Sequence, residues 1–354
     1  MDKHSDTTWW SGTRQRRAVT IPAIAVLAVV SVAVLPLALP LTLVADLVRG
    51  KHFALSRCAL FFAGYLVGEV LFLLATLGHW LAVAGWTEKG RQRLFRQTGW
   101  LGNAWARWMD ALGEHLFGLR RTVQGLEALD SGGPLIALFR HASVGDTTFP
   151  PLILGVAGGR QVRYVVKREL QLDPIFDVIG HRLQACFVAR DSQHSDREIQ
   201  ALCALLDGLG PQDAVAIFPE GTRFSPDKLQ RALPRLEGRL SGEALACAQS
   251  LRRTLPPRLG GPIALLERNP GADVVFCAHA GYEGAATFAD LLHGRTIGRT
   301  IQVRLWRVPF AEIPREREAL IVWLFRQWAA MDQWVELQFQ QAGSSPGPAH
   351  DNTL

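Results

Sequence analysis

Two stretches of the sequence combine residue types that could do chemistry. In the first, His141 and Asp146 are separated by four residues and directly follow the apolar run 134–139. A histidine can take a proton from a hydroxyl near neutral pH, and a carboxylate can hold its other ring nitrogen in the right tautomer. A turn at a strand end would bring the two side chains together. Alternatively, Ser143 and Asp146 have the spacing of a capping box for the following helix.

The second stretch is Phe-Pro-Glu-Gly-Thr-Arg-Phe-Ser at 218–225, again at the end of an apolar run. Proline and glycine indicate a tight loop whose backbone could approach a ligand closely. Arg223 offers a planar fork suited to phosphate. Glu220 could form a hydrogen bond with a hydroxyl of a substrate, orient Arg223 or tie the loop together. Taken alone, the stretch indicates a strand-to-loop transition that holds an ion pair.

Both stretches lie in a region where short apolar runs alternate with helical patterns, which favours an α/β domain with a mixed sheet flanked by helices. The predicted strands are 134–139, 162–167, 183–189, 214–218, 273–278 and 301–306. Ser195 and Glu198 form a capping-box pattern ahead of one helix. A long closing helix is expected from about Pro314 to about Gln341, within a domain spanning 123–341. The tail 342–354 is rich in Ser, Pro and Gly and is expected to be disordered.

The first part of the chain is apolar enough to enter a membrane. A basic segment, 1–17, precedes the uncharged stretch 18–45, and a second apolar stretch, 58–87, is interrupted by Glu69. About 20 apolar residues cross a hydrocarbon core, so residues 18–87 are predicted to form a helical hairpin that spans the membrane or enters it from one side. A spanning hairpin needs Glu69 buried against its partner helix. Basic residues before and after the hairpin favour a cytoplasmic location for both of its ends.

Residues 88–122 predict an amphipathic helix. Leu94, Leu101, Trp105 and Trp108 recur at helical spacing, and Trp100 adds to the aromatic character. Tryptophan prefers membrane–water boundaries, which suits an interfacial helix. The alternative is that the stripe packs on the catalytic core, as amphipathic helices commonly do.

The overall composition supports lipid as the partner. The net charge of +6 would suit anionic lipid headgroups or nucleic acid, but the hydrophobic N-terminal part favours lipid and no nucleic acid. The five cysteines are spread singly without a Cys-x-x-Cys spacing, so neither a zinc site nor a disulfide framework is expected.

Together, His141-x4-Asp146 and Phe218-Pro219-Glu220-Gly221-Thr222-Arg223 resemble the glycerolipid acyltransferase superfamily, typified by 1-acylglycerol-3-phosphate acyltransferase. Lys167-Arg168-Glu169-Leu170 is similar to another segment of the family. Leu255-Pro256-Pro257-Arg258-Leu259-Gly260-Gly261 resembles the lysocardiolipin-acyltransferase-like branch. Two positions depart from the common pattern: Arg140 stands where many members have Asn, and Ala189 stands where Asp is usual.

The resemblance implies a membrane-bound acyltransferase whose catalytic domain faces the cytoplasm. His141 would act as the general base on the hydroxyl of a lysophospholipid or acylglycerol-phosphate, and Asp146 would orient it. Acyl-CoA or acyl carrier protein would supply the acyl group as a thioester, with no metal or other cofactor. The resemblance places Gly221, Thr222 and Arg223 at the acceptor's phosphate, where Lys167 would add a second positive charge. Glu220, from the same loop, completes the expected substrate-binding set.

Two other classes of function fit parts of the sequence. A metal-dependent hydrolase could use His141 and Asp146 as ligands, but further His or carboxylate residues at ligand spacing are missing. A non-catalytic lipid-binding membrane protein could keep the fold without turnover, as Arg140 and Ala189 would permit. His181 and His279 are interpreted as packed or surface histidines.

Overall fold

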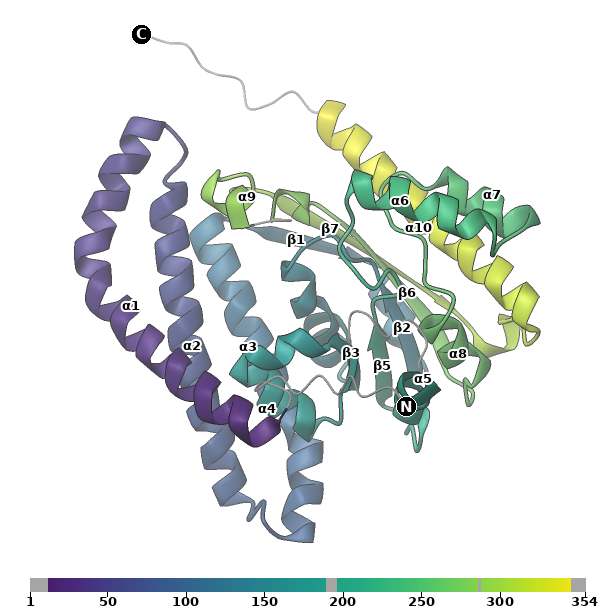
Figure 1. Ribbon diagram of the computed structural model, residues 1–354, viewed down its shortest axis with the longest axis horizontal. Helices are drawn as coiled ribbons and strands as arrows, with labels where there is room; N and C mark the ends of the chain where they lie inside the picture. The colour runs from purple at the N-terminus through teal and green to yellow at the C-terminus, as the bar shows by residue number, and fades with distance from the viewer. Residues whose placement is uncertain (1–11, 189–195, 286–287, 345–354) are drawn as a thin grey trace, which may run out of the picture.

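The computed structural model describes residues 12–188, 196–285 and 288–344, and its centre is one seven-stranded mixed sheet (Figure 1). The strands are β1 (Arg120–Gln124), β2 (Leu135–Phe139), β3 (Gln161–Lys167), β4 (Cys186–Val188), β5 (Asp213–Ile217), β6 (Asp273–Ala280) and β7 (Thr300–Val308). Their order is β1-β7-β6-β2-β5-β3-β4, and only the β6–β7 pair is antiparallel. The predicted mixed sheet flanked by helices is confirmed.

The six predicted strands are all present, but the sequence reading missed β1. This strand reads Arg-Arg-Thr-Val-Gln and lies at one edge of the sheet, where its exposed and half-buried side chains alternate. An edge strand needs little apolar content, because one side of it has no neighbouring strand to pack against. The helix expected to run to residue 122 therefore ends at Phe117, and the chain enters β1 three residues later.

The central strand β2 is buried on both faces, as expected for a strand inside a largely parallel sheet. Ile136 and Leu138 face a core that includes apolar residues of α10 (Arg317–Ser344), α8 (Gly261–Glu267) and α5 (Asp196–Cys203). Leu135, Ala137 and Phe139 face a second core closed by the turns around Leu129 and Ile153. Helices α6 (Pro226–Glu237) and α7 (Gly242–Ser250) pack beside α10 (Figure 1).

The closing helix α10 begins at Arg317, three residues after the predicted start at Pro314. Glu316 accepts hydrogen bonds from the backbone N–H groups of Glu318 and Ala319, so its side chain caps the first turn. A carboxylate in this place is favoured by the unpaired N–H groups of a helix start. The predicted capping box at Ser195 lies outside the described residues.

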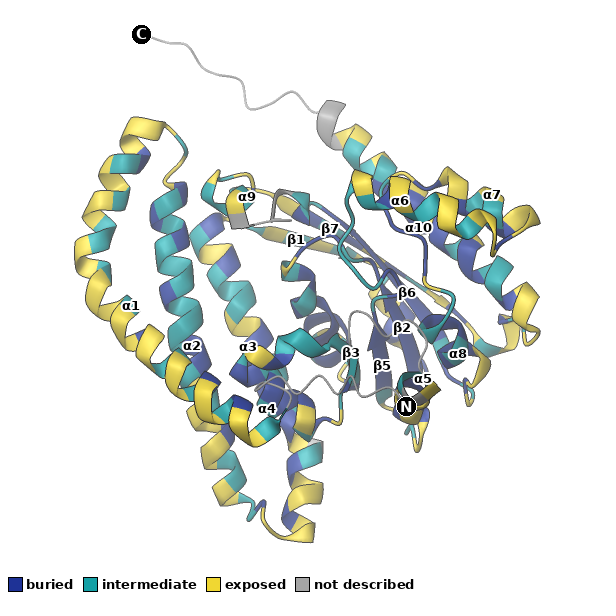
Figure 2. Ribbon diagram, viewed as in Figure 1, coloured by how far each residue is buried: buried dark blue, intermediate teal, exposed yellow. Residues whose placement is uncertain are grey.

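The N-terminal part forms two long helices, α1 (Thr13–Arg49) and α2 (Ala54–Ala82), which lie side by side as a hairpin (Figure 1). Both are long and apolar enough to cross a membrane by length and composition. Figure 2 shows α1 largely exposed, and Val29, Leu37 and Leu41 on it are 70–73% exposed. An apolar surface of this kind is costly in water and is typical of a lipid or protein contact.

Glu69 is buried, as a spanning hairpin requires. Its carboxyl group accepts a 2.9 Å hydrogen bond from the indole N–H of Trp105, which belongs to a third helix, α3 (Glu88–Phe117). The reason is that α3 packs along α2 and places a donor next to the acid. The sequence had no means of showing this third helix beside the hairpin.

The tryptophan and leucine stripe of α3 is divided between core and surface. Leu94, Leu101 and Trp105 are buried, and the latter two pack with Ile175 of α4 (Pro174–Arg182). Trp100 in contrast is 70% exposed. Packing on the α/β domain therefore holds for Leu101 and Trp105, and α3 lies between the hairpin and that domain.

The start of α1 is tied to the domain by ion pairs. Arg16 and Arg17 both contact the buried carboxylate of Asp177 in α4, at 2.6 and 2.7 Å. The last basic residues of the segment predicted at 1–17 thus belong to a folded helix. These contacts fix one end of the hairpin to the layer of helices beside the sheet.

Candidate active site

The predicted site residues come together because their strands are parallel neighbours. Strand β5 pairs with β2 on one side and with β3 on the other, so the carboxyl ends of all three strands meet at one edge of the sheet. His141 follows β2, the loop 218–225 follows β5, and Lys167 ends β3. His141, Lys167, Gly221 and Arg223 line one cavity of about 340 Å³ at this edge.

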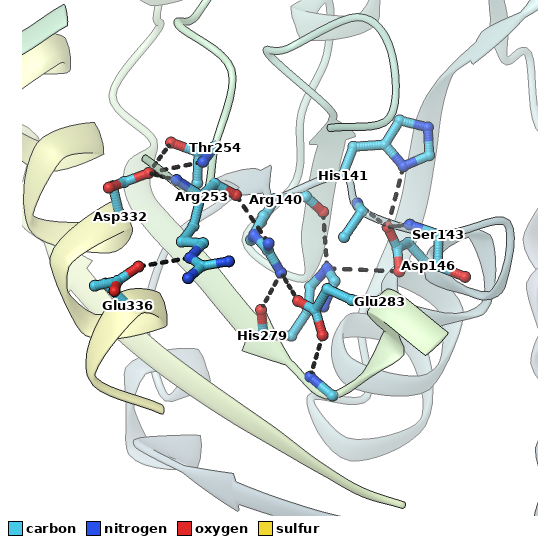
Figure 3. Close-up of polar contacts among 12 residues, drawn as sticks. Arg140, His141, Ser143, Asp146, Arg253, Thr254, His279, Glu283, Asp332 and Glu336 are labelled. Carbon is cyan, nitrogen blue, oxygen red and sulfur yellow. Dashed lines mark hydrogen bonds and ion pairs between the residues drawn. The ribbon is translucent and has the colours of Figure 1, made fainter. Parts of the chain in front are cut away.

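His141 and Asp146 are in contact, as their spacing predicted. A 3-10 turn at Gly145–Thr148 folds the chain back, and Nδ1 of His141 lies 3.1 Å from Oδ2 of Asp146 (Figure 3). With a proton on Nδ1 donated to the carboxylate, Nε2 carries the lone pair that a general base needs. The ring of Phe218 packs against the imidazole at 4.8 Å between centroids.

Asp146 also organises the backbone of its own turn. Its Oδ2 accepts hydrogen bonds from the N–H groups of Ala142 and Ser143, so one half of the predicted capping interaction is present. Burial opposes ionisation of this carboxyl. The neighbouring His279 and the hydrogen bonds from His141 and Ser143 nevertheless hold the pKa of Asp146 below its usual value. The side chain is thus a buried carboxylate that serves both the turn and the histidine.

His279 lies on the other side of Asp146. It is fully buried at the end of β6, with Nε2 3.0 Å from the carbonyl oxygen of Arg140 and 3.6 Å from Oδ1 of Asp146. Burial lowers the pKa of His279, so the ring is neutral at physiological pH and donates its Nε2–H to the carbonyl. It supports the turn that holds Asp146 and lies outside the residues that line the cavity.

Glu220 ties three loops together through backbone contacts. One carboxyl oxygen accepts from the N–H of His141 at 2.7 Å, and the other accepts from the N–H of Leu255 at 2.8 Å. Burial raises the pKa of Glu220 to about 8. In the other direction, the carbonyl oxygen of His141 accepts from the N–H of Phe224. Of the three roles considered for Glu220, these contacts favour the tie between loops.

The rest of the loop presents one side chain to the cavity and turns others away. Gly221 has a left-handed φ of 65° and lies so close to the side chain of Arg258 that a Cβ atom would overlap it. Thr222 accepts a hydrogen bond from Lys228, as does the carbonyl oxygen of Arg223. Arg223, in contrast, lines the cavity together with Lys167.

The opposite wall of this cavity is apolar. It includes Trp105 of α3 and Ile175, Phe176 and Ile179 of α4, the helices that lie beside the N-terminal hairpin. One space therefore combines a histidine, two cationic residues and a hydrocarbon-like surface. Such a site can hold an amphiphile with its polar end near His141.

Arg140, the residue before the histidine, points away into a buried polar network. Its guanidinium is completely buried and contacts Glu283 at 2.6 Å and the carbonyl oxygens of His279 and Arg253 at 2.7 and 2.8 Å (Figure 3). The charge of Arg140 is thus compensated. The same network reaches α10, where Asp332 accepts from the N–H groups of Arg253 and Thr254.

Sequence reasoning did not find the partners of this network. Glu283 follows β6 at the same edge of the sheet, but no motif marks it, and Asp332 lies almost two hundred residues after Arg140. The one available signal was the charge of Arg140 beside the His-x4-Asp motif at the end of a buried strand, since an arginine that is buried requires a carboxylate partner. The position of Ala189 lies outside the described residues.

The fold and the site together define a mixed α/β domain in which His141, paired with the buried Asp146, lines a cavity with Lys167, Arg223 and apolar side chains. The model of the Acyltransferase family matches residues 120–257, which include β1 to β5 and every predicted site residue. This part of the chain is therefore similar to that family. Among solved structures, the chain is similar to the 1-acyl-sn-glycerophosphate (LPA) acyltransferase PlsC from Thermotoga maritima. The sequence identity is 14% and the TM-score 0.45, with 80% of this chain and 98% of that chain covered.

Proposed function

We propose that the protein transfers a fatty acyl group from a thioester to a hydroxyl of a lysophospholipid or acylglycerol-phosphate. The observation that carries this proposal is the pairing of His141 with the buried Asp146 beside an apolar cavity. The family match over residues 120–257 supports the same reaction class. The motif at 255–261 further suggests the lysocardiolipin-acyltransferase-like branch.

In the proposed reaction, Nε2 of His141 removes the proton from the acceptor hydroxyl as its oxygen attacks the thioester carbonyl. Asp146 keeps the other ring nitrogen protonated and stabilises the imidazolium that forms. The carbon–sulfur bond then breaks, and the thiolate leaves with the proton that His141 had taken. The acceptor oxygen is the nucleophile, so no covalent enzyme intermediate forms, and the reaction uses neither a metal nor another cofactor.

The substrate would be held by charge at one end and by apolar contact at the other. Arg223 and Lys167 both line the cavity and would bind the phosphate of the acceptor, for which the guanidinium fork is well shaped. Trp105, Ile175 and Ile179 would contact an acyl chain. The backbone at Gly221 and Thr222 belongs to the same loop, and Glu220 holds that loop against His141.

The second candidate, a lipid-binding protein without turnover, rests on the unusual residue before the histidine. The ion pair with Glu283 turns the side chain of Arg140 away from the imidazole. The substitution therefore leaves the His141–Asp146 contact intact, which favours an enzyme over a binding protein.

The direct test is product formation by the purified full-length protein. We expect mass spectrometry to show a diacylated phospholipid when a panel of lysophospholipids is offered with acyl-CoA or acyl carrier protein thioesters, with a chelator present. Binding of lysolipid without any acylated product from either donor would favour the lipid-binding alternative. Loss of activity with the chelator would favour a metal-dependent reaction.

In Arg223→Ala, the KM for a phosphate-bearing acceptor should rise, and Arg223→Lys should not restore the wild-type KM fully, because a point charge cannot reproduce the guanidinium fork.

We also propose that the hairpin α1–α2 holds the protein in the cell membrane with the catalytic domain in the cytoplasm. The exposed apolar surface of α1 and the basic residues at both ends of the hairpin support this orientation. Acyl thioesters of CoA and of acyl carrier protein are made on that side. A compartment-sensitive reporter fused after Leu354 should give a signal from the cytoplasm, and a signal from the opposite side would reverse the orientation.

A further inference from the structure

Two carboxyl groups meet behind the apolar wall of the cavity that His141 lines, where α2, α3 and α4 pack against one another (Figure 1). Glu69 of α2 is completely buried, and its side chain forms a hydrogen bond with that of the half-buried Asp173, the residue that caps α4. Two carboxyl groups can form such a bond only when one of them carries a proton, since two carboxylates repel each other. The reaction proposed at His141 uses neither group.

The groups around Asp173 are those of an ionised carboxylate. One of its oxygens accepts a 2.6 Å hydrogen bond from the hydroxyl of Tyr65 in α2. The other accepts from the backbone N–H groups of Ile175 and Phe176, at 3.0 and 3.2 Å, in the first turn of α4. A carboxyl group that accepts several hydrogen bonds is stabilised in its charged form, and a helix N-terminus favours the same negative charge.

Glu69 has the opposite surroundings. Its Oε1 accepts the 2.9 Å hydrogen bond from the indole N–H of Trp105, whereas no N–H or O–H group of a described residue donates to its Oε2. A carboxylate would leave that buried oxygen without a donor, but a carboxylic acid can use it to donate to Asp173. A neutral acid is also less costly than a charge within an apolar helix. The contacts therefore place the proton of the pair on Oε2 of Glu69.

Each member of the pair holds side chains that line the cavity. Trp105, which donates to Glu69, is one of the lining residues. Asp173 caps the first turn of α4, which carries the lining residues Ile175 and Phe176. The rings of Trp105 and Phe176 contact each other edge to face, with 5.1 Å between their centroids. The pair thus supports two adjoining parts of the apolar wall from behind, one through each carboxyl group.

The support for this wall comes from the N-terminal hairpin. Tyr65 and Glu69 are four residues apart, so they lie on the same face of α2, and both contact Asp173. The same helix is one of the two that are long and apolar enough to cross a membrane. A helix that could have served only as an anchor therefore holds side chains that line the cavity.

We propose that Glu69 is a protonated carboxylic acid that positions the apolar wall of the cavity for the acyl chain of the acceptor. It acts through Trp105 and Asp173 and is not itself among the residues that line the cavity, so it is a positioning residue. The hairpin would then belong to the substrate site as well as to the membrane anchor. This inference rests on the proposed acyl transfer and explains how the chain of the acceptor is received.

The first experiment locates the proton and needs no activity. In infrared spectra of the full-length protein in detergent at neutral pH, the C=O stretching band of a protonated carboxylic acid should disappear in Glu69→Gln and persist in Asp173→Asn. Glutamine should preserve the structure, because its carbonyl oxygen can accept from Trp105 and its amide can donate to Asp173. Loss of the band in Asp173→Asn alone would place the proton on Asp173 and overturn the assignment, as would identical spectra of wild type and Glu69→Gln.

The second experiment measures binding of the acceptor without a thioester. Titration calorimetry should give a Kd for long-chain lysophospholipids that is about 10-fold higher in Glu69→Leu than in wild type, the usual effect of one lost hydrogen bond with a buried partner. Lysophospholipids whose chains are too short to reach Trp105 should bind both proteins equally, and Glu69→Gln should retain the wild-type Kd. The matched control is Thr76→Val, which removes a buried hydroxyl of α2 that donates within the same helix, to Leu73.

Trp105→Phe provides a second variant in case Glu69→Leu does not fold. It removes the indole N–H that binds Glu69, keeps an aromatic ring in the wall and should raise the same Kd. An equal loss of affinity in Glu69→Gln and Glu69→Leu, or an equal change for short and long chains, would overturn the positioning role. If the Kd values change as expected but no thioester supports transfer, the proposed function fails and this role stands. If transfer is observed and the KM of the acceptor is the same in wild type and Glu69→Leu, the proposed function stands and this role fails.

Discussion

Replacement of His141 by alanine is expected to lower kcat for acyl transfer by about 10²- to 10⁴-fold, the usual contribution of a positioned general base. In the proposed mechanism the imidazole, which lines the cavity, takes the proton of the acceptor hydroxyl, and Asp146, 3.1 Å from Nδ1, would fix its tautomer. The measurement is the initial rate of product formation at saturating acceptor and donor. His293→Ala, at an exposed histidine in a different part of the chain, is the matched control.

Asp146→Asn should reduce the rate by a similar factor, because a neutral amide neither stabilises the imidazolium that would form nor keeps the proton of His141 on Nδ1. The variant separates the two roles of this residue. If the carboxylate only supports the turn, thermal stability will fall while the rate per folded molecule stays near wild type. Wild-type activity in pure, folded His141→Ala would remove the histidine from the mechanism.

The edge of the sheet that carries the site could be predicted from the sequence for a physical reason. Apolar runs short enough to be buried strands end at Phe139 and at Phe218, and the residues of the two motifs follow within two positions. In a parallel arrangement such ends lie on the same side, so two motifs far apart in the chain become neighbours. The structure adds how they are joined: the backbone of His141 donates to Glu220 and accepts from Phe224.

The helical layers were less accessible to sequence reasoning. Composition alone was sufficient to predict the two long apolar helices, because no charged residue interrupts the first over 18–45. It could not give the hydrogen-bond donor to Glu69, which is Trp105 of α3. A hydrophobic pattern shows which face of a helix is buried, but it carries no information about which element buries it.

The buried network around Arg140 was the least predictable part of the site, because its members come from four segments. It joins Arg140 after β2, the carbonyl oxygen of His279 in β6, Glu283 after that strand and the carbonyl oxygen of Arg253 before α8. Each contact depends on tertiary packing, and none follows a sequence spacing. The arrangement nevertheless has a clear energetic consequence that can be measured.

Arg140→Met should destabilise the protein by about 3–5 kcal/mol, the range found when one partner of a buried ion pair is removed. The guanidinium has no exposed surface, and its loss leaves Glu283 and two carbonyl groups without their donor. Thermal unfolding in detergent, followed by circular dichroism, measures the effect. Glu283 retains 25% exposure of its side chain, and water can therefore solvate part of the stranded charge, which favours the lower end of this range.

Two further variants distinguish a buried charge from simple loss of packing. The double variant Arg140→Met/Glu283→Gln should regain part of the stability, because it removes the carboxylate that the single variant leaves without a counter-charge. Arg317→Met provides the control: its ion pair with Glu267 is 55% exposed on the arginine side, and such pairs contribute about 0–1 kcal/mol. Equal losses in Arg140→Met and Arg317→Met would show that the network contributes no more than a surface pair. In that case the loops around His141 would have to be held by Glu220 and by the backbone contacts alone.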